Sequence, residues 1–163
     1  MRLPFIQAGQ IVNTHGVRGE VKMLCWLDTP EDLLGHRRCR IGGREYPIQN
    51  CRVQGTCDLL KLEGVDTMEA AQALRGKTVE LFREDMDRDA IFAAELIGMA
   101  VYAQGAQIGQ IREVLDYPGN SVYVVQGQRQ YMIPAVKEFI LSTDLEADRM
   151  EVRLIEGMAT DES

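Results

Sequence analysis

The chain has 163 residues, 45% of them hydrophobic and 26% charged, a composition that is ordinary for a globular protein and excludes a fibrous or disordered one. No apolar run approaches the ~18 residues of a membrane span, and the first residues lack a signal-peptide pattern, so a soluble cytoplasmic protein without membrane contact is expected. The formal net charge of -7 argues against a protein that binds nucleic acid mainly by neutralising phosphates, because such proteins usually carry a basic surplus.

This charge is distributed unevenly along the chain. Residues 1–88 hold 13 basic and 13 acidic side chains, whereas residues 89–163 hold 5 basic and 12 acidic ones. The whole acidic surplus therefore falls in the second half, and the two halves are expected to face different surroundings.

Strand patterns dominate the first half. In residues 20–27 a two-residue period places four apolar side chains on one face: Val21, Met23, Cys25 and Leu27. Further strands are predicted at residues 38–41, 44–48, 51–54, 59–62 and 78–82. Gly42 and Gly43 indicate a two-residue hairpin loop, because both positions of such a turn require a positive φ.

One short helix is predicted after these strands, at residues 66–75. Asp66 is expected to cap it, with Glu69 completing a capping-box-like arrangement. Ala70, Ala71 and Leu74 would form its apolar stripe, and Gly76 suits the left-handed position that follows a helix.

Residues 83–90 contain six charges among eight residues and little to bury, so they are predicted to be a linker. Strand patterns resume at residues 98–103, 107–114, 121–125, 130–133 and 150–154. The predicted fold is mainly β, with two small β-barrel domains joined by a short charged linker and one short helix in the N-terminal domain. The predicted boundaries are 1–82 for the first domain, 83–90 for the linker and 91–163 for the second.

The four cysteines, Cys25, Cys39, Cys51 and Cys57, include no C-x-x-C pair that would nucleate a zinc site. Only two histidines are present, and the sequence contains no nucleophile elbow, P-loop or dinucleotide fingerprint. We therefore interpret the cysteines as reduced thiols and expect no metal, cofactor or catalytic residue. A thiol-dependent RNA-processing enzyme is the alternative in the enzyme class.

Three blocks of sequence occur together in one known family. The first is residues 9–22 with 28–31, the second is residues 59–66 with 69–71 and 74–76, and the third runs from residues 95–99 through 108–109 and 133–134 to 144–145. In this order, from about residue 5 to residue 158, the chain resembles the RimM family of ribosome maturation factors. The histidine-glycine loop of the first block and the helix of the second are the more specific features.

The resemblance implies an N-terminal RimM barrel and a C-terminal PRC barrel in a monomeric, non-enzymatic factor. It implies assembly of the small (30S) ribosomal subunit head, through binding of a ribosomal protein of that head, and promotion of 16S rRNA processing. The partner particle would be the immature small subunit, and direct contact with its rRNA stays open. The alternative binding function is a PRC-barrel scaffold outside ribosome biology.

Candidate contact residues lie in several segments. His15 and Arg18 belong to a glycine-bounded loop between two strands, where they could face RNA or a partner, or His15 could close the loop by a hydrogen bond. Arg37, Arg38, Arg40 and Arg44 form the densest basic stretch, which either contacts phosphates or protects an edge strand.

In the second half, Phe92 matches one of two aromatic positions that the family carries before its third block, while Ala93 replaces the other. Phe92 is interpreted either as a partner anchor or as a packing residue. Tyr117 and Asn120 lie in a turn that matches a family turn, and Tyr117 is expected to be an exposed aromatic able to contact protein or a base.

Overall fold

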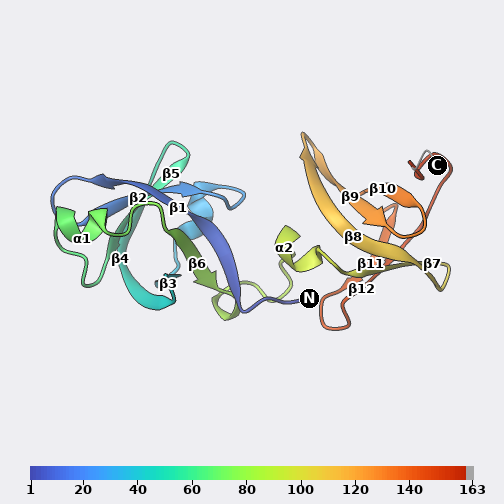
Figure 1. Cartoon of the computed structure of the whole chain (residues 1–163), viewed down its shortest axis with the longest axis horizontal. Coiled ribbons are helices and arrows are strands. Elements are labelled where there is room, and N and C mark those ends of the chain that lie inside the picture. Colours follow the sequence, from blue (N-terminus) through green and yellow to red (C-terminus); the bar gives the residue numbers. More distant parts are fainter. Residues whose placement is uncertain (161–163) are drawn as a thin grey trace. The chain divides into compact units, whose positions relative to one another are not determined.

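A computed structural model describes residues 1–160 and divides into two compact units (Figure 1). Pro4–Arg88 form the first unit, and Met1–Leu3 join the residues from Asp89 onward to form the second. Each unit has a hydrophobic core of its own. The chain therefore passes between the units twice, after Leu3 and again after Arg88. Of the predicted second domain, residues 161–163 lie outside the described residues.

The first unit is a closed barrel with the strand order β1-β2-β5-β4-β3-β6. Its strands are β1 (Phe5–His15), β2 (Glu20–Cys25), β3 (Arg38–Ile41), β4 (Arg44–Gln54), β5 (Cys57–Leu62) and β6 (Thr78–Phe82). Three short helices accompany them: η1 (Pro30–Leu33), α1 (Met68–Gln72) and η2 (Arg83–Asp85).

The alternation predicted for residues 20–27 is confirmed, because Val21 and Met23 are fully buried while Cys25 and Leu27 pack against the same core. Gly42 and Gly43 both have a positive φ, and they join Ile41 to the directly paired Arg44 as the predicted two-residue loop. Two predicted strands, 44–48 and 51–54, are instead one strand, β4. A bulge between Ile48 and Asn50 interrupts the two-residue period of apolar side chains, and the sequence therefore suggested two strands in place of one.

The predicted helix forms, but its cap is Thr67 and not Asp66. The Thr67 hydroxyl accepts a hydrogen bond from the backbone N–H of Ala70 at 3.1 Å. The Asp66 carboxylate instead accepts from the Lys61 ammonium at 2.8 Å. Threonine and aspartate are both good caps, so adjacent candidates are difficult to separate by sequence alone.

The predicted linker at 83–90 is not an open connection over its whole length. Arg83–Asp85 form η2, and residues up to Arg88 belong to the first unit. Arg83 is only 5% exposed, and its guanidinium donates to the carbonyl oxygens of Asp87 and Arg88 at 2.8 and 3.3 Å. The Arg83 side chain thus holds the following residues in place by hydrogen bonds to their carbonyl oxygens. The number of charged residues in the segment does not predict such bonds.

The second unit contains a six-stranded sheet with the order β10-β9-β8-β7-β12-β11. Its elements are α2 (Ala93–Leu96), β7 (Ala100–Ala103), β8 (Ala106–Tyr117), β9 (Asn120–Gln126), β10 (Gln130–Pro134), β11 (Ile140–Asp144) and β12 (Arg149–Val152). All neighbours are antiparallel except β7 and β12, which pair in parallel. The sequence patterns did not predict β11 or α2. The mainly β class with two small β units is confirmed.

Within residues 1–160 there is no helix with the length and apolarity needed to cross a membrane.

Candidate functional site

The turn between β1 and β2 is held in place by a close backbone contact. Gly19 has φ +94°, and a Cβ at this position would lie 2.1 Å from the carbonyl oxygen of Val65. That carbonyl also accepts from the Lys61 ammonium at 2.6 Å, and the same ammonium donates to the Leu62 carbonyl at 2.9 Å. Lys61 therefore orders the loop against which the turn rests, and only glycine fits at the contact.

This turn presents its middle residues outward. Val17 is 70% exposed, and Arg18 is exposed with no hydrogen bond or ion pair to any residue of the described part of the chain. His15, at the end of β1, is half-buried and lies opposite Glu20 in the hairpin register. The two candidate residues thus share one ordered turn, and their contact with a partner stays a prediction.

Arg38 is the most heavily engaged residue of the basic stretch. Its guanidinium binds both carboxylate oxygens of Asp85, at 2.7 and 3.0 Å, and one oxygen of Glu84 at 2.6 Å. It also lies 3.7 Å from the centroid of the Phe82 ring. Hydrogen bonding to Asp85 and Glu84 raises the pKa of Arg38, and the same bond lowers the pKa of Asp85. Much of the charge of Arg38 is therefore compensated within the first unit.

The other three arginines differ in how far they are engaged. Arg40 stacks 3.9 Å from the Phe5 ring centroid and lies 3.9 Å from a Glu80 oxygen. Arg44 is exposed and lies 4.9 Å from the Tyr46 ring centroid. Arg37 is exposed and makes no side-chain contact of these kinds with the described residues. The sequence stretch is thus not a uniform basic surface in space.

An open cleft of about 700 Å³ lies beside this stretch, lined by Leu34, Gly35, His36, Arg37, Arg38, Glu45, Pro47 and Asp85. Its charged walls balance, because two arginines face two carboxylates. Burial lowers the pKa of His36, and the nearby Asp85 carboxylate offsets this effect only in part. The cleft therefore offers mixed polar and apolar walls and no strong single-sign field.

Three of the four thiols lack the environment of a nucleophile, and the fourth, Cys57, is buried. Burial raises the pKa of Cys25, and it raises the pKa of Cys39 and Cys51 to about 12 each. The Cys51 thiol donates to the Asp58 carboxylate at 3.6 Å, and Asp58 is fully buried with a pKa raised by burial to about 6. Within residues 1–160, no cluster of histidine, cysteine and acidic side chains could hold a metal ion.

In the second unit, the hairpin of β8 and β9 ends in an exposed tip. Tyr117 and Asn120 are directly paired across the two-residue loop of Pro118 and Gly119, and Tyr117 is 52% exposed. Just before the tip, the Ser121 hydroxyl donates to the Asp116 carboxylate at 2.9 Å. Serine at this position thus fixes the loop with a local hydrogen bond, and the tip carries an exposed aromatic ring.

Phe92 occupies the N-cap position of the short helix α2, and its side chain makes no capping hydrogen bond. Its backbone is extended, its carbonyl accepts from the Glu95 N–H at 2.9 Å, and its ring is half-buried. Its neighbour Ile91 is 51% exposed and Ala93 is also exposed. Phe92 therefore lies apart from the Tyr117 tip in the chain and on a different element, and its role as an anchor is still a prediction.

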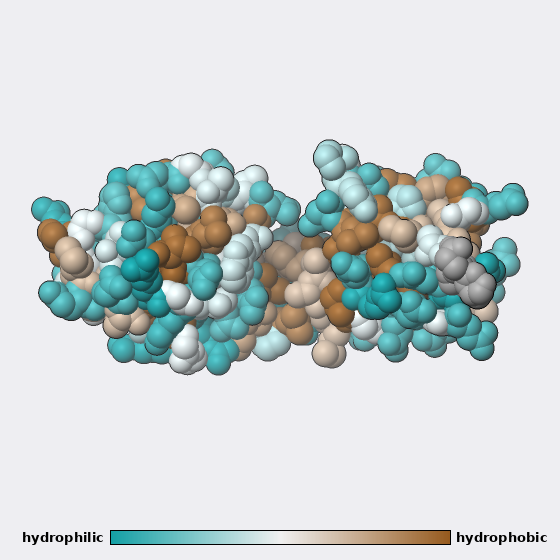
Figure 2. Space-filling view, turned by 45° about the horizontal axis from the view of Figure 1, so that its top comes forward, coloured by the Kyte–Doolittle hydropathy of each residue, from teal (hydrophilic) through white to brown (hydrophobic). Residues whose placement is uncertain are grey.

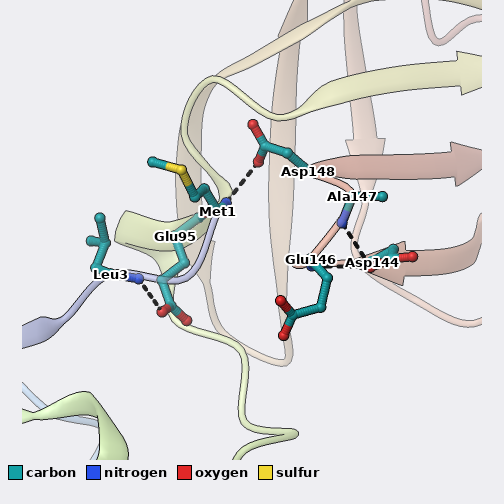
Figure 3. Close-up of polar contacts among 7 residues, drawn as sticks. All are labelled: Met1, Leu3, Glu95, Asp144, Glu146, Ala147 and Asp148. Atoms are coloured by element: carbon teal, nitrogen blue, oxygen red, sulfur yellow. Dashed lines mark hydrogen bonds and ion pairs between the residues drawn. The ribbon is translucent and has the colours of Figure 1, made fainter.

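Figure 3 shows how the first three residues attach to the second unit. The backbone N–H of Leu3 donates to the Glu95 carboxylate at 2.8 Å, and the terminal ammonium of Met1 lies 2.7 Å from an oxygen of Asp148. Arg2 adds an ion pair with Glu146 at 3.3 Å. Because Glu95 is only 1% exposed, its bond with Leu3 supports a buried carboxylate that would otherwise be costly.

The structure thus groups the candidate residues into three separate places. His15 and Arg18 share the first turn, the four arginines lie on or beside the β3–β4 hairpin, and Tyr117 pairs with Asn120, while Phe92 belongs to none of these. Sequence reasoning missed the two buried carboxylates, Asp58 and Glu95. Asp58 stands next to the apolar pair Leu59 and Leu60 in the strand CDLLKL, and a carboxylate in that setting was the available signal.

Comparison with known proteins covers nearly the whole chain. The model of the RimM N-terminal domain matches residues 6–86, and that of the RimM PRC barrel domain matches residues 93–158. A ribosome maturation factor RimM of Clostridium novyi (strain NT) is 31% identical, over 93% of this chain and 96% of the relative. That of Clostridioides difficile (strain 630) is 32% identical, over 96% of this chain and 97% of the relative.

A crystal structure of a RimM protein from Pseudomonas aeruginosa is 29% identical and covers 93% of this chain and 98% of that chain, with a TM-score of 0.48. The two domain models match in the order of the two units, and the alignments with the curated relatives cover at least 93% of either chain. The chain therefore belongs to the RimM family of ribosome maturation factors.

Proposed function

We propose that this protein is a non-enzymatic assembly factor of the small (30S) ribosomal subunit head. In this proposal its second unit binds a basic ribosomal protein of the head, and the complex promotes 16S rRNA processing on the immature subunit. The protein acts in the cytoplasm as a monomer. Family membership supports the class of function, and the distribution of charge supports the mode of docking.

The acidic surplus of residues 89–163 is the observation that carries this proposal. These residues hold 12 acidic against 5 basic side chains. Several of the carboxylates are exposed, among them Glu113, Asp116 and Glu138. Opposite potentials speed the encounter of two proteins and select the partner more than they set the final affinity. The exposed Tyr117 at the tip of the β8–β9 hairpin supplies an aromatic contact of the kind that anchors interfaces.

Not all arginines of the basic stretch are proposed to contact rRNA. Arg38 and Arg40 are engaged by carboxylates and rings of the first unit, so their charge is least available. Arg18 and Arg37 are exposed cations without a partner among residues 1–160, and Arg44 is exposed above Tyr46. These three, with His15 beside Arg18, are the residues that we propose for phosphate contact.

The environment of the thiols supports a role without catalysis. A thiolate is the reactive form of cysteine, and a raised pKa keeps Cys25, Cys39 and Cys51 protonated at neutral pH. Replacing all four cysteines by serine or alanine should leave ribosome assembly intact in cells that depend on this protein. Loss of rRNA processing in a folded variant would instead favour the thiol-dependent enzyme.

Sedimentation of ribosomal particles with the tagged full-length protein tests the proposed class of function. We expect the protein to migrate with free small subunits and to be absent from complete ribosomes. Migration with complete ribosomes, or with no particle at all, would contradict an assembly role and would favour a scaffold outside ribosome biology.

A further inference from the structure

The loop between β3 and β4 is bordered by two cations, one of which comes from outside the basic stretch. A Cβ at the exposed Gly42 would lie 3.7 Å from the Lys77 ammonium, and Lys77 directly precedes β6. A Cβ at the exposed Gly43 would lie 3.8 Å from a terminal nitrogen of the Arg40 guanidinium. Hydrophilic side chains cover much of the face of the first unit that Figure 2 shows, so convergence of cations distinguishes this loop and polarity alone does not.

The backbone of Lys77 is fixed on both sides. Its N–H donates to the Leu74 carbonyl at 3.1 Å, and its carbonyl accepts from the Ile11 N–H at 3.0 Å. Lys77 itself is exposed, and its ammonium makes no ion pair or hydrogen bond with any residue from 1 to 160. Lys77 therefore brings an uncompensated positive charge to the side of the loop.

Arg40 is also held in place beside the loop. Its guanidinium lies 3.9 Å from the Phe5 ring centroid, and its Nε lies 3.9 Å from an oxygen of Glu80, its pairing neighbour on β6. That separation is an ion pair without a hydrogen bond, so the guanidinium N–H groups have no acceptor within residues 1–160. Arg40 is thus a positioned donor whose charge Glu80 offsets in part.

The loop itself supplies two further donors. Gly42 and Gly43 have φ values of 61° and 81°, and their N–H groups donate to no acceptor in the described part of the chain. Consecutive backbone N–H groups in a turn can bind an anion, and here no side chain on the loop shields them.

Carboxylates gather at the other end of the same hairpin. Three of them share the Arg38 guanidinium within 3.5 Å: Glu45, Glu84 and Asp85. At the loop end, Lys77 and the exposed Arg44 have no carboxylate partner among residues 1–160. The hairpin is therefore negative around Arg38 and positive at the loop, although its charges nearly cancel over its whole length.

We propose that the glycine-loop site, formed by Gly42, Gly43, Arg40 and Lys77, binds a phosphate group of RNA. Backbone amides, ammonium and guanidinium groups are the donors that bind phosphate in protein complexes with nucleic acid. These donors come from the loop, from β3 and from the residue before β6, which suits the tetrahedral oxygens of phosphate better than the planar oxygens of a carboxylate. This inference rests on the proposed contact with rRNA and deepens it by naming a site that includes Lys77.

The amide resonances of Gly42 and Gly43 report on this site directly. The full-length protein, labelled with nitrogen-15, is titrated with pentauridylate, with inorganic phosphate and with a pentaglutamate peptide. We expect saturable downfield shifts of both amide protons with pentauridylate, because each N–H gains an acceptor. Inorganic phosphate should produce the same shifts only at higher concentration, and pentaglutamate should produce smaller ones.

A lysine variant measures the contribution of Lys77. Lys77→Gln should weaken pentauridylate binding about fivefold and reduce the slope of log K against log salt by about 0.7, as expected for one lost phosphate contact on a single strand. Lys22→Gln is the matched control, because β2 lies opposite β3 in the strand order of the barrel, and it should retain the parental affinity. Circular dichroism establishes that both variants are folded.

Four results would overturn the inference. Unchanged affinity and salt slope in Lys77→Gln, with no shift at Gly42 or Gly43, would remove the glycine-loop site and leave RNA contact through Arg18 and Arg37 in place. Equal or larger shifts with pentaglutamate would identify a protein-docking loop, and shifts with inorganic phosphate alone would identify a free anion as the ligand. Absence of any RNA binding would overturn the proposed rRNA contact as well, while sedimentation with small subunits decides the class of function separately.

Discussion

The two units differ in their balance of basic and acidic side chains and in how far these pair with one another. Residues 1–88 hold equal numbers of basic and acidic side chains. Two of the four arginines of the basic stretch, Arg38 and Arg40, are engaged within the first unit by three carboxylates and two phenylalanine rings. In the second unit carboxylates outnumber cations, so internal pairing cannot neutralise them. A run of like charges along the chain is therefore a poor predictor of the surface potential, whereas a surplus of one charge sign over a whole unit is a good one.

The units also differ in how they treat strand edges. The first closes its sheet into a barrel, while the order of the second begins at β10 and ends at β11. The edge of β10 is covered by the following chain, since Met132 donates to the Met158 carbonyl and Thr160 to the Gln130 carbonyl. We therefore expect most of the substitutions below in the first unit to change its stability, and the substitution at the tip of the β8–β9 hairpin to change binding.

The largest effect is expected from Gly19→Ala. The new Cβ would meet the Val65 carbonyl at 2.1 Å in a backbone region unfavourable to alanine, so the first unit should lose about 3 kcal/mol or more of unfolding free energy. Trp26 emission measures the first unit, and amide exchange of β8 and β9 should show the second unit unchanged.

Gly16→Ala is the matched control for this substitution. Gly16 also has a positive φ, but a Cβ there meets nothing within 4 Å, so the cost should be only about 1 kcal/mol. Equal losses in the two variants would mean that φ alone, and not the contact with Val65, orders the turn.

Asp58→Asn should change how the stability of the first unit depends on pH. Because burial raises the folded-state pKa of Asp58 to about 6 from 3.8, the folded state binds the proton more tightly. The parent should therefore gain unfolding free energy as the pH falls from about 7 to about 4, and the variant should lack this contribution.

At pH 7.5 the Asp58→Asn variant, which is uncharged at this position, should be more stable than the parent by about 1 to 3 kcal/mol, measured by urea unfolding with Trp26 emission. Asp116→Asn, a change at an exposed carboxylate of the second unit, should leave this pH profile unaltered. Parallel profiles for the parent and Asp58→Asn would show that the buried carboxylate does not titrate in this range.

Tyr117→Ala should affect binding and not folding. We expect about tenfold weaker binding of the small-subunit head protein with an unchanged unfolding temperature, because the exposed ring packs on little of its own unit. Leu141→Ala, at a side chain that is 60% exposed on the same unit, is the control and should retain parental affinity. Equal losses would argue for a diffuse surface without an aromatic anchor.

The smallest effect is expected from comparing Arg38→Gln with Arg37→Gln. Arg38→Gln should lower the unfolding temperature slightly, and less in high salt, because it releases Glu84 and Asp85 from their shared partner. Arg37→Gln should leave the unfolding temperature unchanged and weaken RNA association. A lower unfolding temperature in Arg37→Gln, or weaker RNA association in Arg38→Gln alone, would contradict the division into internally paired and outward-facing arginines.

Local chemistry predicted much of this fold. The glycine pair at residues 42 and 43, the alternation from Val21 to Leu27 and the strands at 38–41 and 78–82 all depend on neighbouring residues, which sequence patterns describe. The edge strand β11 has no fully buried side chain, and a bulge between Ile140 and Ser142 interrupts its two-residue period. The four residues of α2 are too few to express a helical period.

The surroundings of the candidate residues are formed by contacts between residues far apart in the sequence, and sequence patterns did not predict these contacts. Arg38 meets Asp85 across 47 positions and Leu3 meets Glu95 across 92, and neither pairing leaves a local pattern. The same limit applies to residues 83–90, where Arg83 is buried by bonds to backbone oxygens that charge density does not reveal. The roles of His15, Phe92 and Asn120 stay predictions for the same reason.

If a basic ribosomal protein docks on the acidic second unit as proposed, its association rate should depend strongly on the salt concentration. The association of the full-length protein with the small-subunit head protein should be measured by stopped-flow or surface methods over a range of ionic strength. We expect an association rate that falls steeply as salt is added, with a smaller change in the dissociation rate. Absent binding, or a rate that is insensitive to salt, would contradict it.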